Sequence, residues 1–236
     1  MQVQSIITFV RRELVETVGS FWTDAELLDL YNRAERDFVN RTRILEDRAQ
    51  LDVVAGQSRY PLPPNWLSAK AVFYNDKGGV SAAQDGWRRL IPSNLEKRAQ
   101  ENQNFLSANT ENRGTPHTYW IWAREIIIEP APLYTGSADL VLFFKSKPTT
   151  ITASSMQTNV DDSLADGLQA YMLWKAWKKE KEPDLADEAR DEYVGFVRQG
   201  LRFVKKQSGD QRFRLDIQST QSLDGGVGSS FDPLRD

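Results

Sequence analysis

The sequence predicts an α+β protein: a four-helix bundle built from two helical hairpins, with a β-rich insert between them and an extended C-terminal tail. Apolar residues recur every three or four positions near both ends of the chain, and they alternate with polar residues in the middle. This periodicity is lost after residue 207. The predicted parts are a first hairpin over 1–48, the insert over 49–152, a second hairpin over 153–207 and the tail over 208–236.

Composition excludes several classes of protein. The chain has 236 residues, of which 40% are hydrophobic, enough to fill a core. It carries 30 basic and 33 acidic residues, so no general excess of positive charge exists to bind nucleic acid. It contains no cysteine and one histidine, which excludes disulfide frameworks, thiolate catalysis and cysteine-ligated zinc. We expect a soluble protein without a membrane segment, because no long uncharged apolar run occurs.

The first hairpin is predicted from two amphipathic segments. A helix over 4–18 has apolar residues at spacings of three and four, and Gly19 is expected to cap its end. A second helix over 24–43 has a strong start signal, since Thr23 and Glu26 have the spacing of a capping box. The short turn between the two implies an antiparallel pair.

The insert is predicted to be rich in strands because the hydrophobic period falls to about two after residue 48. Residues 51–62 are predicted to form a hairpin that turns at 55–57. A short helix is expected over 93–106, where Ser93 and Glu96 have capping-box spacing. Three further strands are predicted, over 69–74, 119–129 and 138–145.

The second hairpin begins where the helical period returns, at about residue 161. Its first helix is predicted to end by residue 182, and Pro183 suits the first turn of the next helix. The apolar stripe of the first helix contains Leu164, Leu168, Tyr171 and Trp174. The stripe of the second contains Leu185, Ala189, Tyr193, Phe196, Gly200 and Phe203.

No set of residues in the sequence indicates catalysis, a metal or a cofactor. His117 has no second histidine to complete a zinc site or a proton relay. The carboxylate pairs Asp24 with Glu26 and Asp161 with Asp162 lie at predicted helix starts, where negative charge complements the helix dipole. We therefore expect a protein that is not an enzyme.

One basic cluster permits two interpretations. Lys175, Lys178, Lys179 and Lys181 could contact phosphate, or they could form a solvated helix face at the end of a helix that favours cations. Glu180 and Glu182 dilute the positive charge, so the solvated face is the better interpretation.

The tail is rich in Ser, Gly, Gln and Asp and is predicted to be disordered when it is alone in water. Its apolar residues are widely spaced and could be buried only against a partner. The candidate partner-binding residues are Phe213, Leu215, Ile217, Leu223, Phe231 and Leu234.

Several segments together resemble the head-to-tail adaptor, or connector, proteins of tailed bacteriophages, in particular the podophage type with a β-rich insert. The segment FWTDAELL, residues 21–28, opens the second helix, and VAGQSRYPLP, residues 54–63, is followed by Trp66. The segment GTP precedes a strand at residues 114–116, EPAP occupies residues 129–132, and an aromatic, Leu-rich helix covers 166–177. These segments span most of residues 4–205 in the order seen in the family.

The resemblance implies a ring, typically of twelve copies, docked beneath the portal protein of the DNA-filled capsid. The ring would continue the DNA channel, let genomic DNA pass without specific binding, and offer its lower face to tail or nozzle proteins. Such adaptors use a C-terminal extension to bind the portal, which makes the six apolar tail residues candidate portal contacts. The expected location is the head-to-tail interface of the virion, and the host cytoplasm during assembly.

Two rival functions stay open at this stage. A DNA-binding regulatory or packaging accessory protein would present the lysine cluster to phosphate and would retain duplex DNA in a salt-dependent manner. A virion-associated hydrolase would bring distant carboxylates together in a cleft and would act on cell-wall material.

Overall fold

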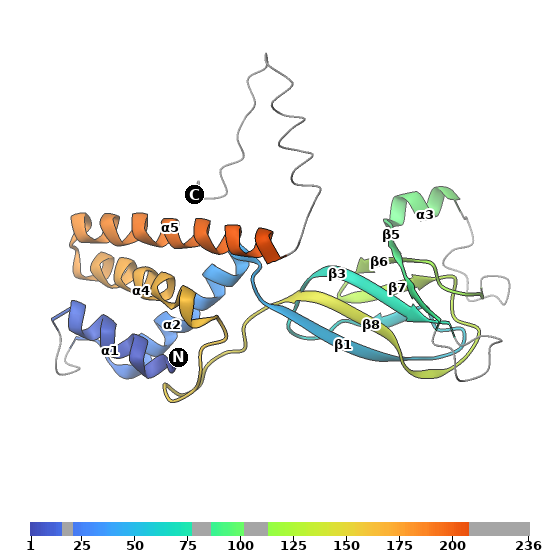
Figure 1. The fold of residues 1–236 in the computed structure, drawn as a ribbon, viewed down its shortest axis with the longest axis horizontal. Coiled ribbons are helices and arrows are strands. Elements are labelled where there is room, and N and C mark those ends of the chain that lie inside the picture. The colour runs from blue at the N-terminus through green and yellow to red at the C-terminus, as the bar shows by residue number, and fades with distance from the viewer. Residues whose placement is uncertain (16–20, 77–85, 102–112, 208–236) are drawn as a thin grey trace, which may run out of the picture. The chain divides into compact units, whose positions relative to one another are not determined.

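A computed structural model describes most of the chain, which divides into two compact units (Figure 1). The helical unit contains Met1–Leu45 and the chain from Lys147 onward, and the β unit contains Glu46–Ser146. The residues described are 1–15, 21–76, 86–101 and 113–207.

The helical unit contains four α-helices and one short 3₁₀ helix within its described residues. These are α1 (Val3–Glu13), α2 (Asp24–Thr42), η2 (Asp162–Leu164), α4 (Ala165–Glu180) and α5 (Pro183–Gln207). Helix α1 ends earlier than predicted, and the expected cap Gly19 lies outside the described residues. Helix α5 begins at Pro183, as predicted.

The predicted capping box of α2 is confirmed. The backbone N–H of Glu26 donates to Thr23 Oγ1 at 3.2 Å, and the backbone N–H of Thr23 donates to Glu26 Oε2 at 3.1 Å. Both donors would otherwise lack a partner in the first turn of the helix. This start fixes the position of Glu26, which takes part in the candidate site.

The prediction of a four-helix bundle made of two hairpins is wrong. Helix α4 packs against α1, α2 and α5, so it lies at the centre of the unit (Figure 1). The physical reason is that α4 buries more than one side, whereas a bundle helix buries one apolar stripe. Its buried residues are Ala165, Gly167, Leu168, Ala170, Tyr171, Met172 and Ala176.

A glycine lets α4 approach its neighbours closely. A Cβ atom placed on Gly167 would lie 2.9 Å from the Cβ of Phe196 on α5 and 3.2 Å from Cε2 of Phe38 on α2. Real Cβ contacts are essentially never shorter than 3.0 Å. Glycine is therefore required at this three-helix contact, although it costs helix propensity.

The β unit has two four-stranded sheets within its described residues. The first has the order β1-β8-β3-β4, all antiparallel, and the second has the order β2-β7-β6-β5, in which only β5 and β6 run parallel. The strands of the first sheet are β1 (Glu46–Val53), β8 (Gly136–Ser146), β3 (Trp66–Asn75) and β4 (Trp87–Arg89). Those of the second are β2 (Arg59–Pro61), β7 (Glu125–Glu129), β6 (Thr118–Trp122) and β5 (Ile91–Pro92).

Two strand predictions are wrong. The predicted hairpin over 51–62 does not form, because β1 pairs with β8 while β2 pairs with β7 in the other sheet. The predicted single strand over 119–129 is a hairpin of β6 and β7. Its two turn residues, Ala123 and Arg124, have φ of 48° and 65°. The predicted strands over 69–74 and 138–145 are confirmed as parts of β3 and β8.

Both sheets contribute side chains to one core in the β unit. The buried residues are Val53, Tyr60, Val72, Tyr74, Leu90, Tyr119, Ile126, Ile128, Leu140, Leu142 and Phe144. A short helix, α3 (Leu95–Glu101), lies within the predicted span 93–106, of which residues 102–106 are outside the described part. Its start differs from the prediction, since the backbone N–H of Lys97 donates to Asn94 Oδ1 at 2.7 Å.

Candidate protein interaction site

Aromatic rings and lysines gather where the start of α2 lies beside the C-terminal half of α4. We call this group the aromatic–lysine cluster, and its members are Phe21, Trp22, Tyr171, Trp174, Lys175 and Lys179. The Nζ atom of Lys179 lies 3.9 Å from the ring centroid of Trp22 and 4.9 Å from that of Phe21. It also donates to Glu26 Oε1 at 3.0 Å. The charge of Lys179 is thus neutralised within the protein.

Lys175 is held in a similar way on the next turn of α4. Its Nζ atom lies 3.4 Å from the ring centroid of Trp174 and 5.3 Å from that of Tyr171. The faces of aromatic rings attract cations. Burial is the main cause that lowers the pKa of the Lys175 ammonium group, and the nearby Lys178 adds to this effect.

Two acidic groups complete the contact between α2 and α4. The pKa of Glu26 is lowered to about 2. The main cause is the hydrogen bond that its carboxylate accepts from the backbone N–H of Thr23, and the second is the hydrogen bond from Lys179. Glu26 is therefore ionised at neutral pH and pairs with Lys179. The indole Nε1 of Trp22 donates to Glu180 Oε1 at 2.8 Å. These interactions join residues more than 150 positions apart in the sequence.

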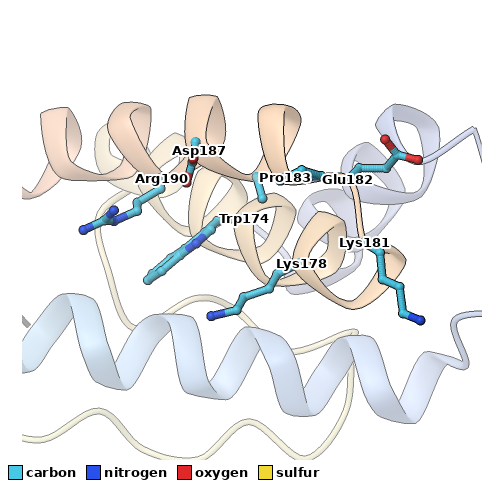
Figure 2. A pocket seen from close by; sticks show the side chains of 8 residues that line it. Trp174, Lys178, Lys181, Glu182, Pro183, Asp187 and Arg190 are labelled. Atoms are coloured by element: carbon cyan, nitrogen blue, oxygen red, sulfur yellow. The ribbon is translucent and has the colours of Figure 1, made fainter.

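The two remaining lysines of the basic cluster border an open hollow between α4 and α5. Figure 2 shows Trp174 and Lys178 projecting from α4 beside Arg190 and Asp187 of α5. The hollow has a volume of about 530 Å³, and Glu182 and Lys181 lie at its rim. Positive and negative groups are mixed here, and two of the four lysines are engaged by rings. This arrangement favours a solvated face with local contacts over a phosphate-binding patch.

The side chains around α4 suit contact with another protein. A second hollow, of about 570 Å³, is lined by members of the aromatic–lysine cluster together with Asp29, Leu30 and Arg33 of α2. Among the described residues that line these hollows, no nucleophile stands beside a base and an orienting group. Aromatic rings surrounded by charged groups are typical of protein interfaces. Trp174, expected in a core stripe, is only partly buried and remains available at this surface.

The other candidate residues are not part of the aromatic–lysine cluster. His117 is exposed, in the β unit, and its backbone N–H donates to the carbonyl of Glu129 at 3.0 Å. Asp161 accepts the backbone N–H of Ser163 at 2.9 Å, which agrees with the expected role at a helix start. Over the described parts of the chain, no group of three or more His, Asp or Glu side chains could hold a metal ion.

The six candidate tail residues cannot be placed. Phe213, Leu215, Ile217, Leu223, Phe231 and Leu234 all lie outside the described residues. The aromatic–lysine cluster was not predicted as a unit, because its members come from two helices that are distant in the sequence. The capping box at Thr23 was the signal that located one half of it.

The fold and this site define a protein that offers surfaces for contact with other proteins. A family model, the SU10 adaptor protein, matches residues 1–218. The chain belongs to the SU10 adaptor protein family, a family of phage head-to-tail adaptors. No curated protein matches the sequence.

Membership of this family makes the protein a head-to-tail adaptor and a component of a phage virion. A structural adaptor family implies a role that is not enzymatic. The family also indicates interaction with portal and tail proteins. None of the described helices is long and apolar enough to cross a membrane.

Proposed function

We propose that copies of this protein close into a ring, typically of twelve, beneath the portal and continue its DNA channel toward the tail. The observation that carries this proposal is the extent of the family match, which covers both compact units and the first part of the tail. The lower face of the ring would attach tail or nozzle proteins. Assembly would take place in the host cytoplasm.

The charges of the protein support passage of DNA without specific binding. The net charge is −3, so the chain as a whole offers no excess of positive charge to phosphate. Lys175 and Lys179 lie against aromatic rings, and Lys179 also pairs with Glu26. A channel that bound duplex DNA tightly would retard it. No contact in the described residues favours the alternative of a DNA-binding regulatory or packaging protein.

We further propose that residues 208–236 attach each copy to the portal. The segment has spaced apolar residues in a polar background, a composition that cannot bury its apolar side chains alone. Burial against a partner would supply free energy that offsets the loss of conformational freedom on binding. Phe213 and Phe231 are the largest apolar side chains available for such a contact.

Light scattering of the purified chain, alone and mixed with isolated portal, tests the ring. We expect a monomer or weak oligomer alone and a complete ring on the portal, because head-to-tail interfaces close only when every copy is correctly oriented. Deletion of 208–236 should abolish co-sedimentation with the portal and leave the melting temperature within a few degrees of the full chain. Phe213→Ala and Phe231→Ala should each weaken docking, while Ser219→Ala serves as the control.

Two results would overturn this proposal. A full chain whose mass is unchanged by portal would contradict the ring. A truncated chain that docks normally but melts many degrees lower would show that the tail is part of the folded core instead.

A further inference from the structure

The solvent-facing side of α5 carries an ordered set of charges. Opposite the buried residues Ala189, Tyr193 and Val197 lies what we call the α5 outer face. It includes Asp184, Glu188, Glu192, Gly195, Arg198, Arg202 and Lys206, all of them exposed. Successive members are three or four positions apart, which places them along one side of the helix.

These charges are arranged symmetrically about Gly195. Glu192 and Arg198 lie three residues on either side of it. Glu188 and Arg202 lie seven residues away, and Asp184 and Lys206 lie eleven residues away. Each of these three acidic residues thus has a basic counterpart at the same distance on the C-terminal side. A fourth exposed acid on this side, Asp191, has the uncharged Gln199 as its counterpart.

This arrangement is unfavourable for the helix alone. The three acidic residues follow one another at spacings of four, as do the three basic residues, and like charges at this spacing destabilise a helix. The helix dipole accounts for the charges in the first and last turns only, since its effect falls off beyond them. Within the described part of the chain, none of these six side chains takes part in an ion pair.

No packing contact inside the described protomer requires the glycine at the centre. A Cβ atom on Gly195 would meet nothing within 4 Å, in contrast to Gly167, where helix packing requires glycine. Glycine in the middle of an exposed helix is destabilising relative to alanine. Because glycine has no side chain, another backbone can approach this point of α5 closely.

We propose that two copies of this chain pair through their α5 outer faces, antiparallel, about a two-fold axis at Gly195. In this arrangement Glu192, Glu188 and Asp184 of each copy oppose Arg198, Arg202 and Lys206 of the other. A parallel pair in register would place like charges together. The contact is isologous and therefore differs from the head-to-tail contacts of a ring. The proposed dimer is a state of the free protein, before it joins a virion.

The pairing is weak and sensitive to salt. Exposed ion pairs contribute little each, and added salt screens them. We expect the dissociation constant of the dimer to rise roughly tenfold or more between low and high ionic strength. A weak dimer of this kind can give way to the ring contacts when portal is present.

Disulfide trapping tests the two-fold axis directly, because the chain has no cysteine. Gly195→Cys places a thiol at the axis, where it meets its own counterpart, and the open space around Gly195 tolerates the side chain. Asn40→Cys, at an exposed position of α2, is the matched control. After mild oxidation at low salt we expect covalent dimers of the Gly195→Cys protein only. Equal trapping of the two variants, or no trapping at position 195, would overturn the proposal.

Charge reversal tests the pairing of acid with base. Glu192→Arg and Arg198→Glu should each abolish dimers in analytical ultracentrifugation, and an equal mixture of the two variants should restore them. Arg36→Glu, on the exposed side of α2, should leave the dimer unchanged. A mixture that stays monomeric, or a wild-type chain that is monomeric at low salt and high concentration, would contradict the proposed contact.

Discussion

Replacement of Tyr193 by alanine is expected to lower the free energy of unfolding of the helical unit by about 3–5 kcal/mol. The side chain is 2% exposed and packs with three aromatic rings. Its ring centroid lies 5.1 Å from that of Tyr171, 6.2 Å from that of Trp174 and 6.4 Å from that of Phe38. The substitution leaves a cavity where three helices meet, and this loss is large against a typical domain stability of about 5–15 kcal/mol.

The hydroxyl of Tyr193 can be tested separately. It donates to Asp37 Oδ2, and burial followed by this hydrogen bond raises the pKa of the phenol. Tyr193→Phe should cost only about 1–2 kcal/mol, because the ring still fills its site. Phe203→Ala, which removes a ring on the same helix that is 37% exposed, is the control and should cost less than Tyr193→Ala. Chemical denaturation measures all three, and a Tyr193→Ala variant within about 1 kcal/mol of wild type would contradict the described core.

The second large effect is expected at Glu35, a carboxylate that is 1% exposed on α2. It accepts hydrogen bonds from Tyr31 Oη at 2.9 Å and from both the backbone N–H and Nδ2 of Asn159 at 2.8 Å. Glu35→Ala removes the acceptor and leaves the buried Tyr31 hydroxyl and the partly buried donors of Asn159 without it. We expect a loss of about 3–5 kcal/mol in the free energy of unfolding.

This loss should also loosen the segment that leads into α4. Asn159 Nδ2 additionally donates to the carbonyl of Thr149 at 2.9 Å, and Asn32 exchanges two hydrogen bonds with the backbone of Ile151. Hydrogen exchange of residues 149–159 should therefore rise in Glu35→Ala. Glu35→Gln, which keeps the shape and one acceptor, should lose less, and the exposed Arg36→Ala should change little. Unchanged exchange in Glu35→Ala would contradict the anchoring role of Glu35.

Local signals in the sequence predicted the starts of α2 and α5 correctly, although the capping box expected at Ser93 and Glu96 did not mark the start of α3. The capping box at Thr23 and Glu26 and the proline at the start of α5 depend on residues within one turn, so they can be identified without the fold. The strands around residues 69–74 and 138–145 were visible as apolar runs bounded by turn residues. Family resemblance, based on short segments in a fixed order, led to the correct class of protein.

Pairings between distant residues could not be predicted. Alternation indicated strands near 51–62, but it contains no information on partners, and β1 and β2 each pair with a strand far along the chain. The turn at Ala123 and Arg124 carries neither the Asn nor the Gly that usually marks a two-residue hairpin. The helices failed to form the predicted bundle because the apolar surface of α4 extends beyond the single stripe that periodicity suggested.

The same limit applies to the candidate site. The lysines of α4 were identified as a cluster, yet the aromatic partners of Lys179, Phe21 and Trp22, lie more than 150 residues earlier. Cation–ring contacts depend on how α2 docks against α4, which no local pattern describes. The charge symmetry of α5 is different, since it lies within one helix and can be found from the sequence once the buried face is known.

Electron microscopy of phage particles assembled without this protein tests the role of head-to-tail adaptor most directly. Portal and tail proteins would be produced at normal levels, and the purified full chain would be added back in a parallel sample. The account predicts heads without tails in its absence, and tailed particles once the protein is restored. Tailed, infectious particles that lack the protein would contradict its assignment as the adaptor.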